Sequence, residues 1–343
     1  MKEFDNGLAN KWEFELDVPV DSEVDVGKLK GFLKRDDTLI FYGGEPLLQV
    51  DKIRKIMDNV ACRFYMQTNG KLLDKLESEY LNRISKILVS IDGSREVTDF
   101  NKGVGTYDKV LENVRLIREN GFAGEIVARM VISSEFSDVY EQVLHLSNLD
   151  LFDSVHWQID AGFYKNDFDE EKFSKFVEEY NKSISKLIDF WVDEMKNGRV
   201  LRFYPFVGIM DSILKNEKTR LRCGAGYANY TITTNGNLVA CPIMGCVKDF
   251  YCGNLDSKEF KVIGVMEPCG KCSYLDVCGG RCLYSNCAKL WPEQGEELIC
   301  KTIKFLVDCL REKADEVREL IDENIISEKD FFYEKYFGPE IIP

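Results

Sequence analysis

The stretch from Pro268 to Cys282 reads PCGKCSYLDVCGGRC and places four cysteines at the spacing Cys-x2-Cys-x5-Cys-x3-Cys. Two cysteines upstream and one downstream extend it to a seven-cysteine pattern: Cys223, Cys241, Cys269, Cys272, Cys278, Cys282 and Cys300. Clustered cysteines of this kind are typical of a metal or iron–sulfur site. Four thiolates suit zinc as well as an iron–sulfur cluster, so the ligand type alone leaves the metal open.

The rest of the sequence predicts a soluble protein of a reducing cytoplasm. Its N-terminal residues lack the charged-then-apolar pattern of a secretory signal, and no apolar run reaches the roughly 20 residues that cross a bilayer. Thiols stay reduced in that compartment, which argues against a disulfide framework. The net charge of −14 argues against binding a nucleic-acid backbone, and a content of 45% apolar residues allows a buried core.

The other five of the 12 cysteines are weaker candidates. Cys62 lies in an apolar run and Cys309 lies beside leucines of a predicted helix, so both are interpreted as core thiols. Cys246, Cys252 and Cys287 flank the seven-cysteine pattern, and any one of them could supply a further ligand.

Residues 38–206 alternate short apolar runs with amphipathic helical patterns, which predicts parallel strands joined by helices. The runs lack clean polar alternation, as expected of strands covered on both faces. Five runs are clear and the last is weaker: 38–42, 62–66, 86–91, 125–132, 154–159 and 200–206. The periodicity stops near residue 207, and we expect the segment beyond it to depend on metal for its stability. A final helix is predicted over 298–321.

Three successive predicted strands end in short polar or glycine residues, namely FYGGEP at 41–46, QTNG at 67–70 and SIDG at 90–93. Because ligands bind beyond the carboxyl ends of parallel strands, these motifs together predict a ligand site. Each motif alone is equally ordinary turn chemistry. Arg129 lies inside the next run, where it needs an anionic partner, either a ligand carboxylate or a structural ion pair.

GGEP, TNG and SIDG at successive strand ends resemble the S-adenosylmethionine-binding part of the radical SAM enzymes. The seven-cysteine pattern resembles the SPASM domain, which carries auxiliary [4Fe–4S] clusters in enzymes that modify peptides and proteins. The stretches LRCGAGYANYTIT, CGGRCLY and EKYFGPEIIP are similar to a peptide-modifying branch of that family. The resemblance implies an α/β fold: a partial (β/α)6 TIM-like barrel over 1–206, lacking its first strand, a small SPASM domain over 207–311, and a C-terminal helix and tail over 312–343.

The same resemblance implies site residues. Contacts to S-adenosylmethionine are expected from eight positions: Gly43, Gly44 and Glu45 at its amino group, then Thr68, Asn69, Ser90, Asp92 and Arg129. One auxiliary cluster would be held by Cys269, Cys272, Cys278 and Cys300. The other would be held by Cys223, Cys241 and Cys282, with its fourth position open or filled by another ligand. On this basis we favour iron–sulfur clusters over zinc.

The sequence lacks the feature that defines the radical SAM family. No cysteine precedes Cys62, so the Cys-x3-Cys-x2-Cys loop that holds the S-adenosylmethionine-binding cluster is missing, and so is a convincing strand before residue 38. Either the chain begins downstream of that loop, or it is a relative that has lost radical chemistry. We favour the first explanation, because a lost strand would expose the edge of the next one. The chain as it stands is expected to bind up to two auxiliary clusters without cleaving S-adenosylmethionine.

The expected function is radical modification of a peptide or protein side chain, with a peptide substrate and an electron donor as partners, and with no nucleic acid or membrane. No catalytic side chain is identified. The two histidines, His145 and His156, are interpreted as structural, although His156 lies where it could face the predicted cavity. The alternatives are a non-catalytic iron–sulfur module for electron transfer or peptide binding, and a zinc-stabilised binding protein.

Overall fold

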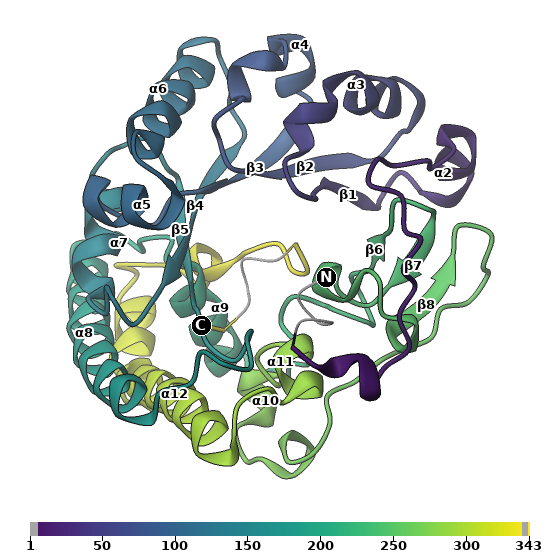
Figure 1. Ribbon diagram of the computed structural model, residues 1–343. Coiled ribbons are helices and arrows are strands. Elements are labelled where there is room, and N and C mark those ends of the chain that lie inside the picture. Colours follow the sequence, from purple (N-terminus) through teal and green to yellow (C-terminus); the bar gives the residue numbers. More distant parts are fainter. Residues whose placement is uncertain (1–5, 338–341) are drawn as a thin grey trace.

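The computed structural model describes residues 6–337 and 342–343. Its largest sheet has five parallel strands in sequence order: β1 (Thr38–Phe41), β2 (Arg63–Thr68), β3 (Ile84–Ser90), β4 (Glu125–Ile132) and β5 (Ser154–Ile159). The sheet curves into an open arc with helices along its outer side (Figure 1). This is the partial barrel that the alternation of runs and helical patterns predicts.

The longer helices of the barrel each bury an apolar stripe. In α6 (Thr106–Glu119) the stripe includes Val110, Val114 and Ile117, which are spaced for one helical face. The side chain of Asp169 begins α8 (Glu170–Lys196) by accepting a hydrogen bond from the Lys172 amide. The other helices are α2 (Val26–Phe32), α3 (Val50–Asn59), α4 (Ser78–Leu81), α5 (Arg95–Lys102), α7 (Val139–Ser147), α9 (Tyr204–Leu214) and α12 (Glu293–Asp322).

The core lies between the sheet and these outer helices. Trp157 of β5 and Trp191 of α8 are fully buried, and both pack against Phe206 of α9, with ring centroids 5.2 and 5.4 Å from that phenylalanine. Fully burying a phenylalanine such as Phe206 stabilises the fold by about 1.5–3 kcal/mol. Helix α12 packs along α8. Among the described residues, no helix combines the length and the apolar character needed to cross a membrane.

The prediction of a sixth strand over 200–206 is wrong. Only Phe203 pairs with the sheet there, through a single parallel bridge to Val155 of β5. Helix α9 begins at the next residue, with Pro205 in its first turn. Proline is well suited to the start of a helix and cannot donate to a strand ladder, so the last three residues of this run, 204–206, are buried as the start of a helix.

A cysteine-rich lobe (residues 215–292) lies across the open side of the barrel (Figure 1). It contains a small antiparallel sheet and two short helices: β6 (Thr231–Ile232), β7 (Asn237–Val239), β8 (Tyr251–Asn254), α10 (Leu275–Cys278) and α11 (Leu283–Ala288). Short 3-10 turns complete the chain: η1 (Leu8–Asn10), η2 (Pro46–Gln49), η3 (Leu73–Lys75), η4 (Pro242–Met244), η5 (Lys248–Phe250), η6 (Cys269–Lys271) and η7 (Glu328–Phe331).

A polar network, the barrel floor, lies at the amino ends of the strands. Lys86 of β3 forms ion pairs with Glu125 of β4 and, at 3.0 Å, with Glu334. Glu125 also accepts hydrogen bonds from Ser154 at 2.8 Å and from the hydroxyl of Tyr204 at 2.7 Å. These partners offset the cost of removing Lys86 and Glu125 from water.

An extended segment near the end of the chain, the C-terminal strap (residues 332–337), completes this floor. Glu334 of the strap pairs with Lys86 and accepts a hydrogen bond of 2.5 Å from the Tyr65 hydroxyl. The next residue, Lys335, forms an ion pair of 2.6 Å with Glu217 of the cysteine-rich lobe. The strap therefore ties the amino end of the barrel to the cysteine-rich lobe.

Candidate functional site

A cavity of about 1650 Å³ lies between the inner face of the barrel and the cysteine-rich lobe. From the barrel it is lined by Gly43, which follows β1, and by side chains of β2, β4 and β5, including Gln67, Arg129 and Gln158. From the lobe it is lined by four cysteines: Cys223, Cys241, Cys246 and Cys282. Of the eight expected S-adenosylmethionine contacts only Gly43 and Arg129 line this chamber, together with three of the seven predicted cluster ligands, Cys223, Cys241 and Cys282. Gly44, Glu45, Thr68, Asn69, Ser90 and Asp92 are not among its lining residues.

The turn after β1 presents bare backbone to this cavity. Gly43 has a φ of +143°, which glycine tolerates and other residues rarely adopt. A Cβ atom added at Gly43 or Gly44 would meet no other atom within 4 Å. The two glycines therefore leave room for a ligand to approach their peptide groups directly, as a cradle for S-adenosylmethionine requires.

The carboxylate of Glu45 joins two of the predicted motifs. Its Oε1 accepts hydrogen bonds from the Thr68 hydroxyl at 2.7 Å and from the Leu47 amide at 3.1 Å. Its Oε2 accepts one from the Asn69 amide at 2.8 Å. In the described residues Glu45 therefore fastens the end of β1 to the end of β2, and its expected contact to a ligand stays a prediction.

Asp92 is also bonded within the chain. It is fully buried, and its Oδ1 accepts a hydrogen bond of 2.9 Å from the Val131 amide. Its Oδ2 lies 3.1 Å from Lys102 Nζ and 3.0 Å from Asn101 Nδ2. Asp92 thus anchors α5 to the sheet, while Ser90 ends β3 directly opposite Arg129 in the strand register.

Arg129 puts a positive charge into the wall of the cavity. Its Nη2 donates to Gln158 Oε1 at 3.3 Å, and its Nη1 lies 3.1 Å from Nδ1 of His156. Arginine can only donate, so this contact requires His156 to accept at Nδ1 and to carry its proton on Nε2. Gln67 belongs to the QTNG motif, but neither Gln67 nor Gln158 was among the expected site residues; in the structure each precedes the last residue of its strand, β2 or β5, by one residue.

Four of the seven cysteines converge where α12 meets the lobe. Burial raises the pKa of Cys278 to about 11, and the neighbouring thiols of Cys269 and Cys300 add to the rise. Burial also raises the pKa of Cys269, and the thiol of Cys272 raises it further. Such mutual effects act between groups that lie near one another, and the assignment of these four thiols to one cluster stays a prediction.

The other three thiols come together from separate segments. Burial raises the pKa of Cys241, which follows β7, and the thiols of Cys282 and Cys223 raise it further. Cys282 caps α11, and Cys223 precedes β6. Of the remaining cysteines, Cys246 lines the same cavity, whereas Cys252 and Cys287 are buried.

Both groups of thiols fit iron–sulfur clusters. They are half-buried to buried sulfur donors, and within residues 6–337 and 342–343 no three His, Cys, Asp or Glu side chains gather tightly enough to hold a single metal ion. A tetrahedral zinc site brings every sulfur to about 2.3 Å from one ion. A [4Fe–4S] cluster also takes thiolate ligands, so the sulfur donors suit it as well as they suit zinc.

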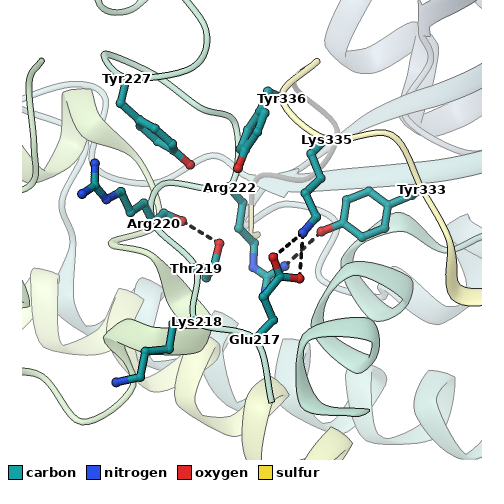
Figure 2. A pocket seen from close by; sticks show the side chains of 9 residues that line it. All are labelled: Glu217, Lys218, Thr219, Arg220, Arg222, Tyr227, Tyr333, Lys335 and Tyr336. Atoms are coloured by element: carbon teal, nitrogen blue, oxygen red, sulfur yellow. Dashed lines mark hydrogen bonds and ion pairs between the residues drawn. The ribbon is translucent and has the colours of Figure 1, made fainter. Parts of the chain in front are cut away.

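A smaller cavity of about 360 Å³ lies on the other side of the strap (Figure 2). Tyr227, Tyr333, Lys335 and Tyr336 line both cavities, so these side chains form the wall between them. Figure 2 shows Tyr227 and Tyr336 directed toward each other, and their rings pack edge to face with centroids 5.6 Å apart.

Comparison with known proteins supports this picture. Residues 15–146 match the family model described as the radical SAM superfamily. The cysteine-type anaerobic sulfatase-maturating enzyme of Clostridium perfringens (strain ATCC 13124) is 23% identical over 273 residues, which are 71% of this chain and 72% of that enzyme.

Solved structures agree on the architecture. Native anSMEcpe with bound AdoMet aligns with a TM-score of 0.62 at 19% identity, over 85% of this chain and 88% of its own. The same protein with AdoMet and the Cp18Cys peptide gives 0.61 at 19% identity, over 85% and 89%. The expected fold class, a partial radical SAM barrel with a cysteine-rich lobe, is confirmed.

Proposed function

We propose that this chain, a member of the radical SAM superfamily, supplies the substrate chamber, the S-adenosylmethionine pocket and two auxiliary clusters for the radical modification of a peptide or protein side chain. The observation that carries the proposal is the large cavity, because the glycine turn after β1 and the thiols of one predicted cluster face it together. A relative that matures sulfatases and a structural neighbour that holds a peptide support a peptide substrate.

The roles proposed for the barrel residues combine the family resemblance with their positions and contacts. The peptide groups of Gly43 and Gly44 would receive the amino group of S-adenosylmethionine, and Arg129 would pair with its carboxylate, because a guanidinium binds a carboxylate in a bidentate way. Glu45 and Asp92 would hold the shape of the pocket through their hydrogen bonds to the chain. When bound beside a reduced [4Fe–4S] cluster, S-adenosylmethionine supplies the radical that abstracts hydrogen.

The grouping of the cysteines supports the roles that the family resemblance implies for them. We assign one auxiliary [4Fe–4S] cluster to Cys269, Cys272, Cys278 and Cys300, and the other to Cys223, Cys241 and Cys282. When bound, such clusters supply one-electron transfer. An electron donor is the second partner in the proposal, and a reducing cytoplasm is its setting, since the thiols must stay reduced to bind a cluster.

Anaerobic reconstitution with iron and sulfide tests this proposal. We expect about eight iron and eight sulfide ions per chain, the content of two [4Fe–4S] clusters. We also expect binding of S-adenosylmethionine that Arg129→Met weakens. The sequence contains no Cys-x3-Cys-x2-Cys loop, so dithionite should yield no 5′-deoxyadenosine. Bound zinc in place of iron, or an Arg129→Met variant that binds S-adenosylmethionine as the unmodified chain does, would overturn the assignment.

A further inference from the structure

Asn286 contacts one of the predicted cluster ligands directly. It lies on α11, where only 8% of it is exposed. Its Nδ2 donates a hydrogen bond to Cys269 Sγ at 3.2 Å. Cys269 belongs to the four thiols that converge where α12 meets the lobe, so this amide N–H lies at the edge of that proposed cluster.

The orientation of the Asn286 amide is fixed by the chain around it. Its Oδ1 accepts a hydrogen bond of 2.6 Å from the Met266 amide, and its Nδ2 donates to the Met266 carbonyl oxygen at 3.3 Å. Rotating the amide by 180° would bring its oxygen against the Met266 carbonyl and the Cys269 sulfur, which are both acceptors. The N–H group is therefore held toward Cys269 without a competing orientation.

The same helix connects the two groups of thiols. Cys282, which belongs to the other predicted cluster, caps α11. Its carbonyl oxygen accepts a hydrogen bond of 3.0 Å from the backbone N–H of Asn286. Within one helical turn the chain thus carries a ligand of one cluster and a donor to a ligand of the other.

We propose that Asn286 is a positioning residue that raises the reduction potential of the cluster held by Cys269, Cys272, Cys278 and Cys300. The inference rests on the proposed function, because it needs a cluster at that site. A reduced cluster carries one more electron than an oxidised one, and part of that charge resides on its sulfur ligands. A hydrogen bond to such a sulfur stabilises the reduced form more, which shifts the potential upward.

A redox titration of the reconstituted chain, followed by electron paramagnetic resonance, tests the proposal. Asn286→Ala should lower the reduction potential of one of the two clusters by about 59 mV, which corresponds to a tenfold change in a one-electron reduction equilibrium. Asn229→Ala is the matched control, because its Nδ2 donates at 3.3 Å to the carbonyl oxygen of Cys223 and not to a sulfur. This control should leave both potentials unchanged.

The iron content distinguishes a failure of the proposed function from a failure of the role proposed for Asn286. If the unmodified chain binds no iron, the proposed function itself is wrong. If Asn286→Ala keeps its full iron content and both of its potentials, the role of Asn286 is wrong. Should the variant lose iron, the unmodified chain grown with ¹⁵N-labelled asparagine gives the answer, because a nitrogen coupling to the reduced cluster is expected and its absence would contradict the hydrogen bond.

Discussion

Replacing Lys86 with methionine should destabilise the barrel floor strongly. The Lys86 side chain is only 10% exposed, and it pairs with Glu125, which is 18% exposed, and with Glu334. Methionine keeps the apolar length of lysine but leaves the Glu125 carboxylate buried with only the hydroxyls of Ser154 and Tyr204 as partners. Removing one member of a buried ion pair costs about 3–5 kcal/mol, because the remaining charge has lost its counterion and stays away from water.

Denaturant unfolding followed by circular dichroism measures this loss. The matched control is Lys109→Met, since Lys109 pairs with Glu112 on the surface, where the two side chains are 41% and 70% exposed. Such exposed pairs contribute about 0.2–1 kcal/mol. Adding Glu125→Leu to Lys86→Met should recover stability, because no uncompensated charge then remains buried. The reasoning is refuted if Lys86→Met loses no more free energy of unfolding than Lys109→Met.

Three further predictions concern acid stability and cluster content. Burial opposes ionisation of Glu125, but its lysine partner and two hydroxyl donors lower its pKa overall. The stability that the Glu125 carboxylate contributes is therefore present above its unfolded pKa of about 4.3 and is lost as the pH falls through the lower folded pKa. Glu125→Gln should flatten the decline in the free energy of unfolding below about pH 5. Cys300→Ala should remove about half of the reconstituted iron, because one of two proposed clusters loses a ligand, whereas Cys309→Ala on the same helix should keep all of it in a colorimetric assay. Gly279→Ala should also reduce iron binding, because Gly279 has a φ of +70° and an added Cβ would lie 1.9 Å from a backbone oxygen. An added Cβ at Gly264 would meet nothing within 4 Å, so Gly264→Ala should bind as much iron as the unmodified chain does.

The strands were predictable where turn residues bound an apolar run on both sides. The predicted runs 125–132 and 154–159 coincide with β4 and β5 at both ends. The run 200–206 misled because a short, mostly apolar segment has no period that separates a buried strand from a buried helix. Nearly all of α9 is buried, and Pro205 in its first turn was the available signal for a helix start.

The site was predictable in its location more than in its contacts. The motifs identified which strand ends meet, because strand topology alone decides that. They could not show that the Glu45 carboxylate is taken up by Thr68 and Asn69, or that Asp92 pairs with Lys102, since those bonds depend on which donors the folded chain brings opposite. Asn286 was missed because a single amide in a short helix leaves no pattern, although it follows Cys282 by one helical turn.

The C-terminal strap also constrains the order in which the molecule can fold. Arg63 Nη1 donates to Glu334 Oε1 across 271 positions of the chain, and Tyr65 reaches the same carboxylate across 269. Contacts between such distant positions form slowly, because a long loop must close before they are gained. During synthesis the strands of the arc would emerge from the ribosome long before Glu334 does. Until the strap has been synthesised, Lys86 at the amino end of β3 therefore lacks one of its two carboxylate partners.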